Sequence, residues 1–304
     1  MHRPYFDEST DVSGVFRVSI SPDLPRPHLG IVAAVHGNEP CGLVALSRIR
    51  RAVEAGELDL RAGTLVLIHG NPDATAEGRR YTKGGVDLNR ILDYHFVDGL
   101  PPSRWTPEHH RALALRPVLE SLDAALDLHS TTAPTPPFAI TSRLPSSRKL
   151  AEQLGLRHLT VGWEAPGLVS DRVMIGFLAR RDVPGVGVEC GQHHHPEAGE
   201  VAYGTAVRFM VAHGVVDPPN ATATTGRHSP PVVVQVAEAI KKPSADFRFE
   251  RELGGLQHLR AGDLLGSDRN LEFRLKHDGY VLMPNDGVPV GQDMLYLARI
   301  EGDD

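Results

Sequence analysis

The sequence predicts an α/β fold: a mostly parallel mixed sheet flanked by helices, with a small β domain at the C-terminal end. In the first two thirds of the chain, short apolar runs such as residues 29–35 alternate with helical periodicity, which favours a parallel sheet covered on both faces. Residues 215–231 are rich in Pro, Thr, Asn and Gly without periodicity, as in a linker. Short β-rich runs separated by turn signals follow. A chain of 304 residues is long enough for two domains, which we expect at 1–218 and 229–304.

Each expected element has a local signal. The segment 40–55 begins with Pro40, which suits a first helical turn, and Leu43, Leu46 and Ile49 fall on one face. Further helices are expected at 108–121, 145–154, 172–181 and 197–213. Strands are expected at 29–35, 64–68, 124–128 and 185–188, and in the C-terminal part at 232–236, 247–249, 271–275, 280–283 and 294–300.

The composition is that of a soluble globular protein and limits the partners. A net charge of -6 gives no general basic field, which argues against nucleic acid and membrane surfaces as partners. No stretch approaches the roughly 18 apolar residues of a membrane span, and the polar N-terminal segment lacks the apolar core of a signal peptide. The two cysteines make neither a disulfide framework nor a Cys-rich zinc site. We therefore expect a cytoplasmic protein.

Four polar residues follow the expected strands at the point where each apolar run ends: His36, Asn71, His129 and Glu189. In parallel sheets, ligands bind outside the carboxyl ends of the strands. Residues far apart in the sequence are therefore expected to meet at one edge of one sheet.

His36 and Glu39 are three residues apart and can converge on one metal ion, and His129 can arrive from a different strand. Two His and one Glu are a common ligand set of catalytic zinc, which keeps one position for water. An isolated HxxE pair is more often a loop histidine and a helix-start glutamate, so the prediction depends on the combination with His129. Asp127 points away from Leu128 and is expected to support the site.

The stretch 71–90 carries three arginines, Arg79, Arg80 and Arg90, beside Asn89. A guanidinium grips a carboxylate in two places, whereas a solvated surface loop is the plain alternative. Asp87 is placed to hydrogen-bond a ligand imidazole and fix its tautomer.

Glu189 ends an apolar run and adjoins Gly191, so it is expected to face a partly desolvated cleft. There it can take a proton from a zinc-activated water and return it to the leaving nitrogen. A strand-end glutamate paired with a surface arginine is the plain alternative.

Together, these segments resemble the aspartoacylase and succinylglutamate desuccinylase family, a branch of the zinc carboxypeptidase-like hydrolases. The resemblance covers roughly residues 29–215 and rests on HGNEPCG (36–42), NP (71–72), RRY (79–81), DLNR (87–90), DLHSTT (127–132) and VECG (188–191). Ser130, where aspartoacylases tend to carry Asn, and residues 133–137 depart from the family pattern.

The resemblance implies one zinc ion per chain, with His36, Glu39 and His129 as its ligands. It further implies Glu189 as the general base and Arg80 as the group that polarises the carbonyl. The remaining implied roles are substrate-carboxylate binding by Asn89 and Arg90, and support of His36 by Asp87.

Three residues in a row, His193 to His195, are interpreted as a rim loop because consecutive side chains diverge, and Cys41 and Cys190 as small buried residues. The predicted function is a zinc-dependent amidohydrolase that removes an N-acyl group, such as acetyl or succinyl, from a carboxylate-bearing amino acid. The alternatives are a zinc carboxypeptidase acting on peptide C-termini, which needs an open groove, and a non-catalytic metal-binding or ligand-binding protein. The expected partner is the small N-acyl amino acid, and the sequence leaves a homo-oligomer possible.

Overall fold

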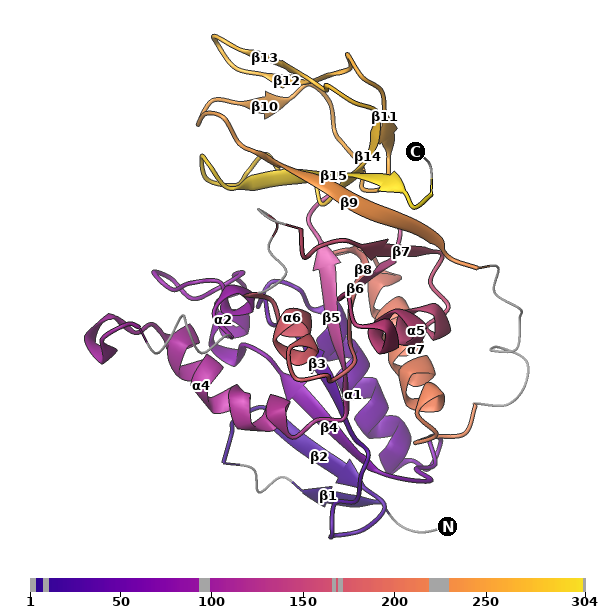
Figure 1. The fold of residues 1–304 in the computed structure, drawn as a ribbon. Helices are drawn as coiled ribbons and strands as arrows, with labels where there is room; N and C mark the ends of the chain where they lie inside the picture. Colours follow the sequence, from indigo (N-terminus) through magenta and orange to yellow (C-terminus); the bar gives the residue numbers. More distant parts are fainter. Residues whose placement is uncertain are drawn as a thin grey trace.

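A computed structural model describes residues 4–7, 11–92, 99–165, 168, 172–218 and 230–302. One twelve-stranded sheet runs through this part of the molecule, with helices on both of its faces in the N-terminal part (Figure 1). The strand order is β1-β2-β4-β3-β5-β8-β6-β7-β9-β15-β14-β11. The first eight strands are β1 (Tyr5–Asp7), β2 (Val15–Ser19), β3 (His28–Ala33), β4 (Thr64–His69), β5 (Ala124–Thr131), β6 (Phe138–Thr141), β7 (His158–Val161) and β8 (Gly185–Gln192).

The helices divide between two apolar cores, one on each face of the sheet. Helices α1 (Cys41–Glu54), α5 (Pro145–Gln153) and α7 (Ala198–Ala212) contribute to one core, and α4 (Pro107–Glu120) and α6 (Met174–Ala179) to the other. The shorter elements are α2 (Pro72–Ala76) and the 3-10 turns η1 (Leu88–Arg90) and η2 (Pro102–Arg104).

Helix α1 lies very close to strand β3. A Cβ atom at Gly42 would come within 2.7 Å of the Cβ of Ala33, so a larger residue there would push the helix away. This contact fixes the start of α1 above the carboxyl end of β3, where His36 and Glu39 lie.

The predicted α/β fold with a mostly parallel mixed sheet is confirmed. Strands β4, β3, β5 and β8 are parallel neighbours, whereas β6 runs antiparallel to β8. The expectation that His129 and Glu189 lie beyond their strands is wrong. These two residues pair with each other in the β5–β8 ladder, and Glu189 also pairs with Phe138 of β6, so the neighbouring strands prolong both strands past the apolar runs.

The C-terminal part contributes a β structure of mostly antiparallel strands. Four of its strands, β9 (Val232–Lys241), β15 (Asp293–Ile300), β14 (Gly279–Leu282) and β11 (His258–Leu259), continue the main sheet because β9 pairs in parallel with β7. A second sheet holds β10 (Arg248–Phe249), β12 (Leu264–Ser267) and β13 (Glu272–Arg274).

This C-terminal part also has an apolar core of its own, which includes Phe247, Leu265, Val281 and Leu295. The predicted linker falls largely on residues 219–229, outside the described residues, and the division into two domains stays a prediction. Within the described ranges, no helix is both long and apolar enough to cross a membrane.

Candidate active site

A cavity of about 950 Å³ lies at the carboxyl ends of β3, β5 and β8. Its floor carries His36, Glu39, His129 and Glu189, and one wall is the segment 79–90. The C-terminal strands β9 and β15 and the loop between β14 and β15 line the opposite side, which we call the roof. Of the four residues predicted to meet at one sheet edge, His36, His129 and Glu189 line the cavity. Asn71 does not line it; its side chain accepts from Ala74 N and donates to Glu108.

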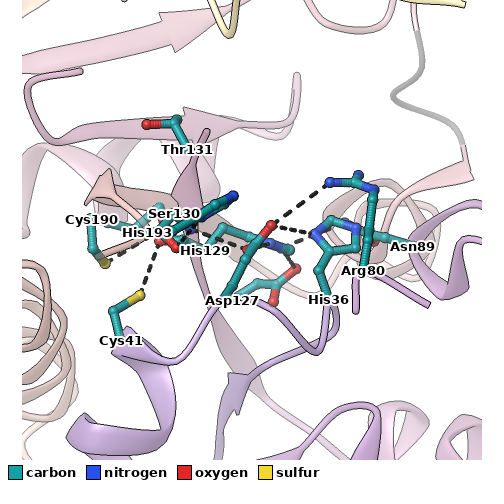
Figure 2. Close-up of polar contacts among 12 residues, drawn as sticks. His36, Cys41, Arg80, Asn89, Asp127, His129, Ser130, Thr131, Cys190 and His193 are labelled. Atoms are coloured by element: carbon teal, nitrogen blue, oxygen red, sulfur yellow. Dashed lines mark hydrogen bonds and ion pairs between the residues drawn. The ribbon is translucent and has the colours of Figure 1, made fainter. Parts of the chain in front are cut away.

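His36, which follows β3, and His129 of β5 lie close together (Figure 2), and both contact Glu39. One potential ligand atom from each lies within 4.8 Å of the others, and all three residues are buried. The Nδ1 atoms of His36 and His129 lie 2.8 and 2.9 Å from the two oxygens of Glu39. Burial alone would raise the pKa of Glu39, but the two imidazoles outweigh it and hold that pKa well below the usual range. The triad thus presents one carboxylate and two imidazole nitrogens to a common point.

Each imidazole also contacts an aspartate carboxylate through Nε2, the nitrogen that does not face Glu39. Nε2 of His36 lies 3.1 Å from Asp87 Oδ1, and Nε2 of His129 lies 2.8 Å from Asp127 Oδ2. A carboxylate on the outer nitrogen fixes the tautomer and leaves Nδ1 free to bind a metal ion. The sequence predicted supporting positions for both aspartates.

This donor set fits a zinc ion. Two imidazole nitrogens and one carboxylate are the usual protein ligands of a catalytic zinc site, and one position remains for a water molecule. A buried oxygen in the same pocket, Oε2 of Glu189, has no hydrogen-bond partner among the described residues. Such a group requires a partner that the protein does not provide.

Glu189 is only 7% exposed. Burial is the main cause that raises its pKa to about 8, Glu39 adds to the rise, and the nearby His129 opposes it. A carboxylate held in this environment readily accepts a proton. Glu189 is therefore equipped to act on a molecule bound in the cavity.

The arginines of the wall differ in their partners. Arg80 donates from Nε and Nη2 to Asp87 Oδ2 at 3.1 and 2.9 Å, and its Nη1 lies 3.7 Å from Glu39 Oε1. Arg90 donates only to the carbonyl of Asn89 and has no carboxylate partner among the described residues. The Asn89 side chain accepts from the backbone N–H of Met174 at 2.8 Å and faces Nε2 of His129 at 3.5 Å. Of these groups, Arg90 retains the freest guanidinium.

Glu108 in the first turn of α4 is a supporting residue that the sequence did not reveal. It has no solvent exposure and accepts hydrogen bonds from Thr82 N at 2.8 Å, Thr82 Oγ1 at 3.1 Å, Val86 N at 3.3 Å and Asn71 Nδ2 at 3.4 Å. A Cβ at Gly85 would lie 2.2 Å from its Oε2, so only glycine fits there. Glu108 thus holds the segment that carries the pocket arginines. In the sequence it resembles any acidic residue at a helix start.

Four further residues line the cavity, and sequence reasoning assigned a role to none of them: Trp163, which follows β7, and Lys241, Asp293 and Tyr296 of the roof. No recognisable motif surrounds them, and an aromatic residue in a β-rich segment is common. Their position in the cavity depends on the long-range pairing of β9 with β7 and β15, which no local pattern announces.

The sequence predicted that His193 belongs to a rim loop and that Cys41 and Cys190 are small buried residues. His193 lines the cavity, and its Nδ1 lies 2.8 Å from the hydroxyl oxygen of Ser130. The backbone N–H of Ser130 donates to Glu39 at 3.1 Å. Cys41 and Cys190 are both buried, with the Cys41 thiol donating to the carbonyl of His129 at 3.4 Å.

The profile of the succinylglutamate desuccinylase/aspartoacylase catalytic domain matches residues 25–203. The chain is 32% identical over 142 residues to an N-acyl-aromatic-L-amino acid amidohydrolase (carboxylate-forming) of Rattus norvegicus, which covers 44% of this chain and 43% of that protein. It is 30% identical over 131 residues to a succinylglutamate desuccinylase of Erwinia tasmaniensis, covering 38% and 36%. The matched region thus spans less than half the length of these curated relatives.

Solved structures agree in fold. A succinylglutamate desuccinylase of Vibrio cholerae superposes with a TM-score of 0.73 at 20% identity, over 94% of this chain and 85% of that chain. One from Vibrio parahaemolyticus superposes with a TM-score of 0.71 at 17% identity, over 98% and 91%. At these identities the likeness concerns the fold alone.

Proposed function

This chain belongs to the succinylglutamate desuccinylase/aspartoacylase family, and from that premise we propose that it is a zinc-dependent amidohydrolase that releases an amino acid from its N-acyl derivative. The observation that carries the proposal is the buried Glu189 carboxylate, with one oxygen unpartnered among the described residues, in the same cavity as His36, Glu39 and His129. The names of the rat and Erwinia relatives, an amidohydrolase and a desuccinylase, support an amide-cleaving reaction of this class.

His36, Glu39 and His129 would hold the zinc ion, with Asp87 and Asp127 orienting the two imidazoles. A bound zinc ion supplies Lewis-acid polarisation of the scissile carbonyl and makes a water molecule more acidic. The ionised state of Glu39 suits it to this cation.

Glu189 moves the proton. Its carboxylate takes a proton from the attacking water while the water oxygen bonds to the carbonyl carbon, and it then gives that proton to the departing nitrogen as the C–N bond breaks. The products are a carboxylic acid and the free amine of the amino acid. Glu189 ends the cycle ionised again, so proton and bond changes balance.

Arg80 and Arg90 divide the remaining work. Arg80 lies within 4 Å of Glu39 and would stabilise negative charge that develops on the carbonyl oxygen. Arg90, which forms no ion pair with a carboxylate among the described residues, would bind the substrate α-carboxylate. Asn89 contacts both His129 and the start of α6, so it would join the carboxylate site to the metal site.

Hydrolysis of N-acetyl and N-succinyl amino acids by zinc-loaded protein, followed as free amine, tests the proposal. We expect turnover that a chelator abolishes and that added zinc restores. Dipeptides with free C-termini are assayed in parallel. Faster cleavage of the dipeptides than of the N-acyl amino acids would indicate a carboxypeptidase instead. Zinc binding without turnover of any substrate would indicate a binding protein.

A further inference from the structure

The roof of the cavity presents carbon surfaces, because the polar atoms of its aromatic residues are already bonded. Trp163 Nε1 donates to Thr160 Oγ1 at 2.9 Å, and the Tyr296 hydroxyl donates to Asp293 Oδ2 at 3.1 Å. The two rings meet edge to face with centroids 5.0 Å apart. A stable aromatic pair of this kind offers an apolar wall with a fixed shape.

Ile140 and Met283 extend this wall. Both line the cavity, and both pack against the apolar cluster that contains Trp163 and Tyr296. We call these four residues, Ile140, Trp163, Met283 and Tyr296, the apolar wall. They come from β6, from the segment after β7, from the segment after β14 and from β15, so the wall exists only in the assembled sheet.

The cation of the roof is neutralised. Lys241 Nζ lies 3.1 Å from Asp293 Oδ1, while the other oxygen of Asp293 accepts the hydrogen bond from Tyr296. Asp293 therefore forms an ion pair with the ammonium group that could otherwise attract an acidic group of the substrate. It also adds a negative charge nearby. An acidic side chain placed beside Lys241 would lose part of its water and meet a cation that is already paired.

The apolar wall and Arg90, the proposed binder of the α-carboxylate, line the same cavity. Burial is the main cause that raises the pKa of the Tyr296 hydroxyl, and the positive charges of Arg90 and Arg80 oppose that rise, which places the ring within their electrostatic reach. In an amino acid, the carboxylate and the side chain leave the same carbon atom. A substrate whose carboxylate is held by Arg90 would therefore place its side chain in the cavity that this wall lines.

We propose that the substrate is an N-acyl amino acid with a single carboxylate and a large apolar side chain, aliphatic or aromatic, which packs against Ile140, Trp163, Met283 and Tyr296. Asp293 is then a specificity-determining residue, because it cancels the charge of Lys241. The inference depends on the proposed amidohydrolase function and adds the class of amino acid to it.

The test compares kcat/KM for N-acetyl-L-leucine, N-acetyl-L-phenylalanine, N-acetyl-L-alanine, N-acetyl-L-aspartate and N-succinyl-L-glutamate. We expect the leucine and phenylalanine derivatives to exceed the acidic ones by roughly 10–200-fold, the range that a hydrophobic pocket can supply. Preference for either acidic substrate would overturn the inference and leave the proposed function intact. Absence of turnover with all five would refute the proposed function and the inference with it.

Two variants sharpen the result. Asp293→Asn should release Lys241 and raise kcat/KM for N-acetyl-L-aspartate about tenfold relative to N-acetyl-L-leucine. Met283→Ala should lower kcat/KM for the leucine derivative more than for the alanine derivative. Val290→Ala, at an exposed position beside the cavity rim, serves as the matched control. An unchanged substrate ranking in both variants would contradict the assignment of the wall.

Discussion

Asp127 and His129 lie on the same face of strand β5, and Oδ2 of the carboxylate approaches Nε2 of the imidazole to 2.8 Å. The alternation of a β-strand imposes this contact, since residues two apart project to the same side. The bond occupies the outer nitrogen of His129 and turns Nδ1 towards Glu39, 2.9 Å away. A strand periodicity thus orients one of the candidate metal ligands.

The first prediction concerns zinc content. Removing a ligand nitrogen leaves two donors, so His129→Ala or His36→Ala should lose the metal, with about one zinc per chain in the wild type. Asp127→Asn keeps the ligand but weakens its orientation and should lower zinc affinity about 10–100-fold. Elemental analysis and competition with a chelator measure both effects. The exposed His110→Ala is the control, and metal retained in both ligand variants would contradict the site.

The second prediction separates binding from chemistry at Glu189. The amide of Glu189→Gln has nearly the same shape but cannot accept the proton, so kcat should fall by at least about 10²–10⁴-fold. Zinc content and KM should stay close to the wild-type values. Steady-state kinetics and elemental analysis on one preparation provide the measurement. A variant that retained most of its kcat would remove Glu189 from the reaction.

The third prediction concerns the substrate carboxylate. Arg90 would bind a group that is charged in both the ground state and the transition state, so its loss should appear mainly in KM. Arg90→Lys keeps the charge but not the two-pronged contact, and KM should still rise by roughly 10–100-fold. The wild type should reject a substrate with an amidated α-carboxylate. If Arg90→Ala treated the free acid and the amide as the wild type does, Arg90 would not bind the carboxylate.

The fourth prediction concerns Glu108 as a positioning residue. Glu108→Ala leaves the buried N–H groups of Thr82 and Val86 without an acceptor and should lower the free energy of unfolding by about 1–3 kcal/mol. Glu108→Gln retains one acceptor oxygen and should be intermediate. Both variants should keep their zinc yet show a raised KM, because the arginine-bearing segment loses its anchor. Unchanged KM together with lowered stability would reduce Glu108 to a structural role.

Glu108 also gives a signed dependence of stability on pH. Burial would raise its pKa, but hydrogen bonds from Thr82 outweigh it and the net shift is downward. A depressed carboxyl pKa stabilises the fold above the ordinary glutamate value of about 4.3 and loses that contribution as pH falls through the folded pKa. The wild type should therefore lose more stability than Glu108→Gln between about pH 5 and pH 3, as measured by denaturant unfolding.

The floor of the candidate site was accessible from sequence because its residues follow apolar runs in short motifs. His36 and Glu39 directly precede one helix, and His129 and Glu189 follow apolar runs. The apolar wall and Asp293 were not accessible, because they reach the cavity through pairing between strands distant in sequence. Nor could local patterns show that β5 and β8 extend past the motif residues, since that depends on which strands become neighbours.

The pairing of β7 with β9 has a mechanical consequence. Residues His158 to Val161 are hydrogen-bonded alongside Val232 to Gln235, so floor and roof belong to a single slab of sheet. A rigid-body rotation of the C-terminal part away from the N-terminal part would break the hydrogen bonds between β7 and β9. We therefore expect substrate and product to pass by movement of rim segments outside the ladders, such as residues 284–292, rather than by a hinge between the N-terminal and C-terminal parts.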